Sequence, residues 1–269
     1  MSQLRVVALA DSSPYADDVL YMAHNLSRWT GGELLVLSEA EAMTSGMLDN
    51  EMKARMKADA VQATRDRLGA RIAALGMKAE VRVVVGGLLD DALAAMSGPG
   101  FFVAGIKGTG VLRRILIGST VVKLIERSPV PVMAVPRGER LTAPLHLYVG
   151  VAPGEPFDTA PLHRLLVDLG GNVGHVSFFS VTSDDDRAQA VALEGLRRVE
   201  ADRAFTVPTD VQVLPGELGL AELKDHVASD PHALLVLRKG GRELSDQLFR
   251  RFFINDLVYA GKAPMVVLP

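Results

Sequence analysis

A single stretch, residues 103–136, places the tightest limits on what this chain can fold into. It reads VAGIKGTGVLRRILIGSTVVKLIERSPVPVMAVP, with glycines on both sides of a basic segment. The apolar run at 101–104 is short and bounded by glycine, which is typical of a buried parallel strand. Gly118 and Ser119 open an amphipathic segment, so Ser119 is a candidate N-cap for a helix. The final PVMAVP predicts a closing strand.

The glycine loop between this strand and this helix has the properties of a phosphate-binding site. Gly105 and Gly108 can reach backbone angles that residues with side chains avoid. The free N–H groups at the helix start favour anions, and Lys107 adds positive charge beside them. Each glycine taken singly is explained equally well by a turn, but the whole arrangement predicts a phosphate cradle.

The spacing G-x2-G-x9-G-[ST], followed by a short helix and a strand that begins with Pro-Val, resembles the universal stress protein family. The resemblance implies that the protein binds an adenine nucleotide, ATP with or without magnesium. It also implies that Asp11, in the segment ADSSPYADD, contacts the adenosine, although Asp11 by itself is more simply explained as a helix cap. The nucleotide-binding residues implied are Ala10, Asp11, Gly105, Lys107, Gly108, Gly118, Ser119 and Thr120.

Two features depart from the family pattern. Lys107 stands where the family often has arginine, and Ser38-Glu39 takes the place of a histidine–valine pair at the end of the second predicted strand. A carboxylate at Glu39, beside the adenine pocket, would weaken or alter base preference. We therefore expect the selectivity for ATP to be affected.

Strands alternate with helices along the chain, which indicates an α/β fold with parallel sheets and right-handed crossovers. Ligands of such sheets bind beyond the carboxyl ends of strands, and Asp11 and Gly105 both follow predicted strands. The strands are predicted at residues 4–10, 34–37, 79–85, 101–104 and 131–135, and again at 145–151, 176–181, 211–214, 233–237 and 264–268.

The second half of the chain repeats the first, in a register set by aligning residues 264–267 with 131–134. We expect two tandem open parallel-sheet domains of the universal stress protein type, residues 1–138 and 141–269, packed as a pseudo-dimer. The closing strands are sheet edges that favour pairing, so the halves are expected to pair within one chain. Homodimerisation of the whole chain stays open.

The second half carries bulky residues where the first has its glycine loop. Arg238 falls at the place of Gly105, Arg251 at that of Gly118, Phe252 at that of Ser119 and Pro153 at that of Asp11. These side chains fill the space that a phosphate needs, so only the first domain is expected to bind nucleotide. The basic residues of the second half are expected to form a solvated face.

Composition narrows the classes of partner. A net charge of −3 over 269 residues gives no electrostatic footprint for nucleic acid or an anionic membrane. No apolar run is long enough to cross a bilayer, so membrane insertion is not expected. The absence of cysteine excludes disulfides, thiol catalysis and thiolate metal sites. The N-terminus enters a strand at once, without room for a signal peptide, so we expect a cytoplasmic protein.

No residue pattern nominates a catalytic base or a metal site. The chain lacks G-x-x-x-x-G-K-[ST], and its six histidines show no ligand spacing such as H-E-x-x-H. The acidic run at 184–186 is better explained as a helix start. We therefore expect an ATP-binding, stress-response regulatory protein with a protein partner, no catalytic residues and at most weak ATPase activity. The alternatives are a slow ATPase or adenylyl-transferring enzyme, and a nucleotide-free partner-binding scaffold.

Overall fold

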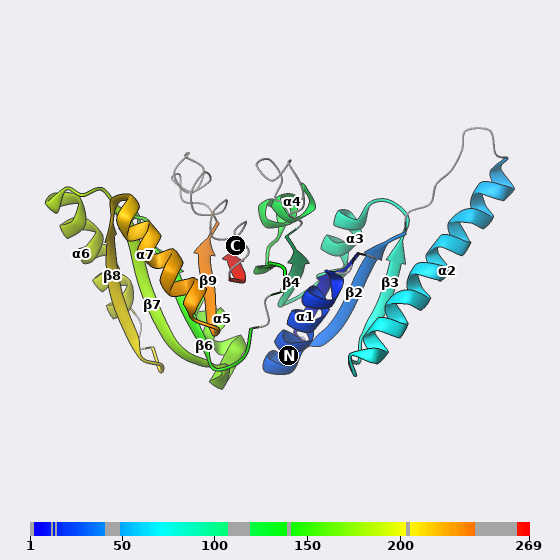
Figure 1. The fold of residues 1–269 in the computed structure, drawn as a ribbon, viewed down its shortest axis with the longest axis horizontal. Helices are drawn as coiled ribbons and strands as arrows, with labels where there is room; N and C mark the ends of the chain where they lie inside the picture. Colours follow the sequence, from blue (N-terminus) through cyan, green and yellow to red (C-terminus); the bar gives the residue numbers. More distant parts are fainter. Residues whose placement is uncertain are drawn as a thin grey trace.

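The computed structural model describes residues 3–11, 13, 15–40, 49–106, 119–138, 141–202, 205–239 and 263–269 (Figure 1). The strands are β1 Arg5–Leu9, β2 Glu33–Glu39, β3 Glu80–Val84, β4 Gly100–Gly105, β5 Val132–Val135, β6 Leu145–Gly150, β7 Val173–Thr182, β8 Thr209–Pro215, β9 Ala233–Arg238 and β10 Met265–Leu268. The helices are α1 Ala16–Thr30, α2 Asn50–Ala74, α3 Leu88–Ala95, α4 Ser119–Arg127, α5 Ala160–Leu169, the 3-10 turn η1 Gly170–Asn172, α6 Asp186–Asp202 and α7 Gly216–Ser229. Every predicted strand is present, and the largest difference is β7, which begins at Val173 rather than at residue 176.

The strands in the described part of the chain form one sheet with the order β3-β2-β1-β4-β5-β10-β9-β6-β7-β8. Neighbouring strands are parallel except at the centre, where β5 and β10 run antiparallel with Met133 opposite Val266. The order is symmetrical about this pair, so each half contributes five strands in an equivalent arrangement. The predicted α/β class, and the predicted pairing of the two halves through their closing strands, are both confirmed.

Helices cover both faces of the sheet, because successive strand residues point to opposite sides. On one face pack α1, α2, α5 and α6, whose buried residues include Leu20 and Leu165. On the other pack α3, α4 and α7, whose buried residues include Leu124 and Leu223. Within the described ranges, no helix has both the length and the apolar character needed to cross a membrane.

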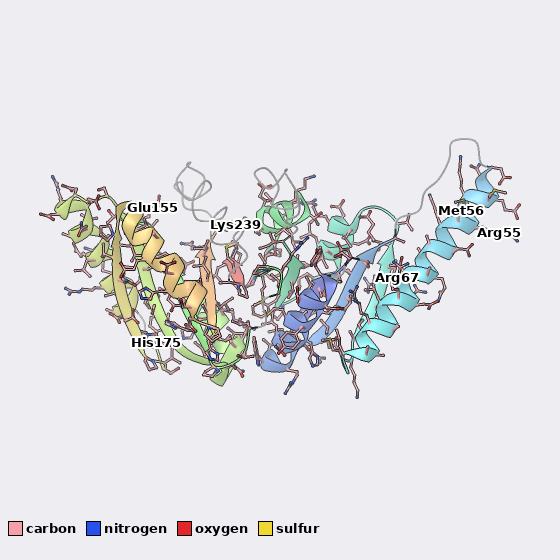
Figure 2. The ribbon with its side chains drawn as sticks, viewed as in Figure 1. Arg55, Met56, Arg67, Glu155, His175 and Lys239 are labelled. Atoms are coloured by element: carbon pink, nitrogen blue, oxygen red, sulfur yellow. The ribbon has the colours of Figure 1, made fainter. Side chains whose placement is uncertain are left out.

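Helix α2 extends beyond the sheet at its N-terminal end. Its buried residues, Thr64, Leu68 and Ile72, all lie in its second half. Arg55 and Met56 lie at the far end of the helix, away from β3 (Figure 2). Only the second half of α2 is therefore held by apolar packing.

The acidic run that follows β7 begins a helix, as the sequence predicts. A carboxylate oxygen of Asp185 accepts a hydrogen bond from the backbone N–H of Ala188, with the two atoms 2.9 Å apart. Helix α6 starts at the next residue, Asp186. The run thus satisfies an N–H group that the first helical turn leaves unpaired.

Candidate functional site

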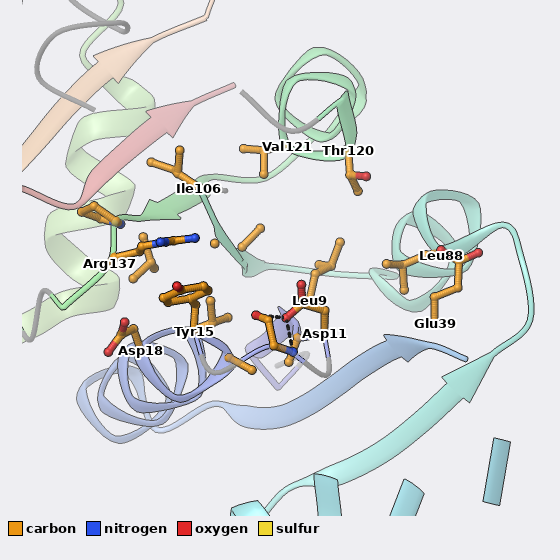
Figure 3. A pocket seen from close by; sticks show the side chains of 18 of the residues that line it. Leu9, Asp11, Tyr15, Asp18, Glu39, Leu88, Ile106, Thr120, Val121 and Arg137 are labelled. Atoms are coloured by element: carbon orange, nitrogen blue, oxygen red, sulfur yellow. Dashed lines mark hydrogen bonds between the residues drawn. The ribbon is translucent and has the colours of Figure 1, made fainter. Parts of the chain in front are cut away.

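A pocket of about 480 Å³ lies at the carboxyl ends of β1, β4 and β5 (Figure 3). Its walls include residues 9–11 after β1, 104–106 after β4 and 135–137 after β5. From β1 the chain moves outward to β2 and β3, and it then returns to β4 on the other side of β1. The pocket therefore lies where the strand order reverses, which is the usual ligand site of open α/β sheets.

Three helices present residues from their first turns to this pocket. Ala16 belongs to α1, Leu88 to α3 and Thr120 to α4. The first N–H groups of a helix have no partner within it, and the helix dipole is positive at that end. The pocket therefore favours a ligand with negatively charged groups.

Asp11 lines the pocket and is oriented by the loop after β1. Its Oδ1 atom accepts hydrogen bonds from the backbone N–H of Ser13, at 3.0 Å, and from the Ser13 hydroxyl. The carbonyl oxygen of Ser13 accepts a hydrogen bond in turn from Arg71, at 2.9 Å. The N-cap of α1 is Tyr15, so Asp11 does not occupy the capping position. The simple helix-cap explanation of Asp11 is therefore wrong, because its carboxylate organises a turn at the pocket wall.

Arg137 brings a positive charge to the described part of the pocket wall. Its guanidinium carbon lies 3.3 Å from the ring centroid of Tyr15, in a cation–π contact (Figure 3). Asp18 accepts a hydrogen bond from the backbone N–H of Gly138 at 2.9 Å, which fixes the chain beside this arginine. The Nε atom of Arg137 is buried and has no hydrogen-bond partner among the described residues. An unpaired buried donor is costly, so this atom favours a ligand that accepts a hydrogen bond.

Glu39 lies at the opposite end of the pocket from Arg137, beside Leu88 (Figure 3). It is the last residue of β2 and is exposed, whereas the preceding Ser38 is fully buried. Glu39 thus places a carboxylate at one end of the pocket, whereas Arg137 brings a guanidinium to the other end, beside the carboxylate of Asp18.

The structure brings several of the predicted nucleotide-binding residues together. Those that line the pocket are Ala10, Asp11, Gly105 and Thr120. Ser119 is the residue from which α4 is described. Lys107, Gly108 and Gly118 lie outside the described residues, as do Arg251 and Phe252 of the second half. The predicted glycine loop is thus represented in the structure by the residues on either side of it.

Gly105 is required by close packing rather than by an unusual backbone angle. It has strand geometry, and it is not among the glycines with positive φ. A Cβ atom at this position would lie 2.9 Å from Cγ2 of Val19 in α1. The prediction that this glycine serves a special backbone conformation is therefore wrong. The missing side chain lets α1 approach β4 and leaves this wall of the pocket as bare backbone.

Sequence reasoning missed Tyr15, Asp18 and Arg137, which form one end of the pocket. By sequence alone, Arg137 begins the polar segment Arg-Gly-Glu-Arg, which indicates a hinge between the halves. Its position directly after a closing strand was a usable signal, because the carboxyl ends of parallel strands meet at one edge of the sheet. Nothing in the spacing connects Arg137 with Tyr15, since only the packing of α1 against the sheet brings them together.

The strand registers define the equivalent positions in the second half. β1 begins its pairing with β4 at Arg5, and β6 begins its pairing with β9 at His146. Counting forward from these residues makes Ala152 the counterpart of Asp11. The prediction that Pro153 takes this place is wrong by one residue, although neither residue offers a carboxylate.

Arg238 ends β9 as Gly105 ends β4, which agrees with the register predicted from the sequence. Its guanidinium lies 3.6 Å from the carboxylate of Asp158. A charged side chain with its own partner thus stands where the first half has bare backbone. The carboxyl edge of the second half therefore lacks two of the features that form the pocket.

Comparisons with known proteins agree with this architecture. A family model described as "Universal stress protein family" matches residues 4–136. A universal stress protein from Archaeoglobus fulgidus DSM 4304 is 17% identical, with a TM-score of 0.66 over 98% of this chain and 95% of that one. A putative universal stress protein from Pseudomonas aeruginosa UCBPP-PA14 is 13% identical, with a TM-score of 0.59 over 99% and 93% of the two chains. A search of curated protein sequences finds no match.

The same fold also occurs in another setting. The cytoplasmic domain of a prokaryotic cation chloride cotransporter is 11% identical, with a TM-score of 0.52 over 99% of this chain and 95% of that one. At such identities, structural likeness establishes the fold and no shared activity. The match to the family model shows membership of a sequence family, which structural likeness at these identities does not. Through residues 4–136, the chain belongs to the universal stress protein family.

Proposed function

We propose that this protein binds an adenine nucleotide, ATP in the first instance, in the pocket of its first half and acts as a regulatory protein. The observation that carries the proposal is the pocket at the strand-order reversal, which Asp11 and Arg137 both line. Its volume of about 480 Å³ lies within the range of small-molecule sites. The carboxylate of Asp11 suits the donors of adenosine, and Arg137 suits phosphate.

The magnitudes favour binding over catalysis. Micromolar affinity needs about 8 kcal/mol, and a hydrogen bond to a charged group contributes roughly 1.5–3 kcal/mol. Three or four such contacts and a buried base are therefore enough. Fast phosphoryl transfer needs a positioned base or metal in addition. The described lining holds three carboxylates. Asp11 is engaged with Ser13 and Asp18 with Gly138, and Glu39 lies at the end of the pocket away from Arg137 (Figure 3), so none is placed as a free general base beside a phosphate at Arg137.

Magnesium would be held mainly by the nucleotide. Among the described residues that line the pocket, no three metal-ligating side chains converge. Magnesium commonly binds through one or two carboxylates together with phosphate oxygens. ATP with or without magnesium thus remains compatible with these residues.

We also propose that residues 1–138 and 141–269 act as two units with different roles. The first would bind the nucleotide in the cytoplasm, where ATP is abundant. The second would support the first through the β5–β10 pair and contribute to the surface that a protein partner contacts. The Arg238–Asp158 ion pair supports this division, because it lies where the first half forms its pocket.

The first test identifies what the protein carries. The untagged full chain is purified without added nucleotide and denatured, and the released small molecule is identified and counted by chromatography and mass spectrometry. About one ATP per chain supports the proposal. A protein that is empty, and that also fails to take up ATP in a titration, contradicts it and favours the nucleotide-free scaffold.

A matched pair of variants then locates the site. Gly118→Leu is expected to abolish ATP binding, because a bulky side chain would take the space that a phosphate needs in the cradle predicted from the sequence. Gly195→Leu, in α6, is the control, since a Cβ there meets nothing within 4 Å. Undiminished binding in Gly118→Leu would count against the assignment. Metal-dependent turnover above roughly 1 per second that this substitution removes would favour the enzyme instead.

A further inference from the structure

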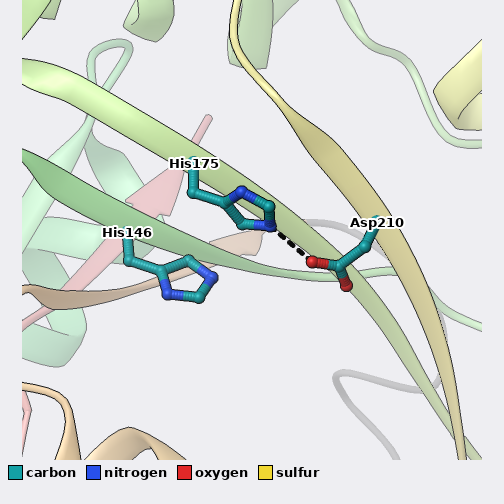
Figure 4. Close-up of side chains that lie close together, drawn as sticks. All are labelled: His146, His175 and Asp210. Carbon is teal, nitrogen blue, oxygen red and sulfur yellow. Dashed lines mark hydrogen bonds and ion pairs between the residues drawn. The ribbon is translucent and has the colours of Figure 1, made fainter.

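A second group of functional side chains lies in the other half of the molecule, on β6, β7 and β8. It contains His146, His175 and Asp210, whose nitrogen and oxygen ligand atoms all lie within 4.8 Å of one another (Figure 4). Glu155 follows the carboxyl end of β6. His175 lies at the opposite end of the strands in this half of the molecule (Figure 2). The group therefore lies at the amino ends of the strands, away from the nucleotide pocket.

The strand register brings these residues together. His146 on β6 pairs with His175 on β7, and Ser177 on β7 pairs with Asp210 on β8. The intervening residues, such as Leu147 and Val176, belong to the core on the opposite face. All four polar side chains thus project from one face, on three adjacent strands, as the two-residue alternation of strands requires.

The polar atoms converge on one point. Nε2 of His175 lies 2.5 Å from Oδ2 of Asp210. The hydroxyl oxygen of Ser177 lies 2.8 Å from that same oxygen and 2.8 Å from Nε2 of His146. Ser177 has only one proton to offer to these two atoms, so the cluster holds more lone pairs than its hydroxyl can satisfy.

A second layer of contacts orients His146. Its Nδ1 atom lies 2.9 Å from Oδ2 of Asp230, and the Tyr148 hydroxyl donates to the same oxygen at 3.2 Å. The Tyr148 ring stacks on the imidazole, with centroids 4.1 Å apart. A carboxylate that accepts from one imidazole nitrogen directs the lone pair of the other toward a metal. In His146, Nε2 is that other nitrogen, and it faces the cluster.

His146 is only partly buried, and the outer residues of the cluster reach the surface. His175 and Asp210 are partly exposed, which leaves a route from solvent.

Asp230, His146 and Ser177 also follow the order of a hydrolytic triad, but the site does not suit acyl transfer. Ser177 is only 6% exposed, beneath His175 and Asp210. Its strand is paired on both sides, by β6 and β8, so the backbone N–H groups nearby are committed to the sheet. An oxyanion would therefore find no donors from β7.

We propose that His146, His175 and Asp210 form a binding site for one divalent transition-metal ion, with Zn²⁺ as the best match. Two imidazoles and one carboxylate are a common zinc ligand set, with the fourth position left to water. Magnesium and calcium prefer sites made of oxygen atoms alone. Asp230 acts as the positioning residue for His146. On binding, the His175–Asp210 contact opens and His175 turns a lone pair toward the ion.

The test is a Zn²⁺ titration of the untagged, chelator-treated full chain, read by calorimetry and by metal analysis after dialysis. We expect one Zn²⁺ per chain, a higher unfolding temperature with Zn²⁺, and no comparable binding of Mg²⁺ or Ca²⁺. Asp230→Asn should weaken binding roughly 10- to 100-fold, and His175→Gln should weaken it further. His163→Gln, on α5 across the sheet, is the matched control and should bind like the wild type.

Circular dichroism establishes that each variant is folded, and Asp210→Asn replaces His175→Gln if the latter is not. Fewer than one bound Zn²⁺ per chain would overturn the proposal. Stoichiometric binding that a folded His175→Gln or Asp210→Asn variant retains unchanged would overturn it as well. Because the cluster lies at the opposite edge of the sheet, these variants should still bind ATP, so this test and the nucleotide test can fail separately.

Discussion

The two halves of this molecule have equivalent sheets but differ where the strands end. At the carboxyl edge, the first half presents Asp11 and the bare backbone of Gly105 to a pocket. The equivalent positions of the second half hold Ala152 and Arg238, and Arg238 pairs with Asp158. A shared register thus supports an open cavity in one half and an ion pair in the other.

The amino ends of the strands differ as well, and here it is the second half that carries the proposed ligand-binding side chains. In the first half, Arg5 and Glu33 face each other on β1 and β2 with a nitrogen–oxygen distance of 3.4 Å. Their counterparts by strand register are His146 and His175. An exposed ion pair of this kind contributes little beyond solubility, whereas two imidazoles beside a carboxylate can hold a metal.

The comparison shows which positions the fold constrains. The apolar strand residues are buried in both halves, because they fill the core under the helices. Asp11 and Gly105 are only partly buried, as are their counterparts Ala152 and Arg238, so these positions can change while the sheet order stays the same. In this architecture, the residues at the two ends of the strands therefore carry the function.

The largest expected effect concerns the joint between the halves. Met133→Ala, opposite Val266 in the β5–β10 pair, removes a side chain that is almost fully buried. We expect a loss of about 2–5 kcal/mol in the free energy of unfolding, from lost burial and the cavity left behind. Met52→Ala, at a position 49% exposed, is the control and should change stability by less than about 0.5 kcal/mol. Equal values for the two variants in urea unfolding would contradict a shared core at the joint.

The next prediction gives the first half the residue of the second. Gly105→Arg should reduce ATP affinity by more than about 100-fold, since the new side chain occupies the pocket wall. The contact with Val19 should also cost about 1–3 kcal/mol of stability. The reciprocal variant, Arg238→Gly, should leave ATP affinity unchanged. Calorimetric titration with ATP measures the affinity of both variants. A loss of ATP affinity in both would refute the assignment of binding to the first half.

Asp11→Asn tests the carboxylate of the pocket with little change in shape. The asparagine oxygen can still accept from Ser13, so the turn should persist. Losing the charge on one hydrogen bond should weaken ATP binding about 10-fold. Asp158→Asn in the second half is the control, and it should have no effect on the same titration. Equal affinities for wild type and Asp11→Asn would remove Asp11 from the site.

The smallest effect is expected at Glu39. Its carboxylate lies at one end of the pocket and is exposed, so solvent screens its repulsion of a triphosphate. Glu39→Gln should strengthen ATP binding about two- to threefold, and the gain should shrink as salt is added. Glu33→Gln, at the other end of β2, is the matched control. Weaker binding in Glu39→Gln would mean that the carboxylate contacts the ligand favourably.

The sequence by itself determined the order of strands and helices, the repeat and the family. Local patterns carry this information, because a buried parallel strand needs a short apolar run such as residues 101–104 and because turns need glycine or proline. The alternation of strands and helices also predicted that Asp11 and Gly105 lie at the carboxyl ends of parallel strands. These properties depend on neighbours along the chain.

Only the tertiary structure decided which distant residues meet. The packing of α1 against β4 explains Gly105 through Val19, where the sequence suggested a backbone angle. The same packing brings Tyr15 to Arg137, and the register of three strands brings His146 to His175. Such contacts join residues far apart in sequence, and no spacing rule contains them, because they follow from how the sheet aligns its strands.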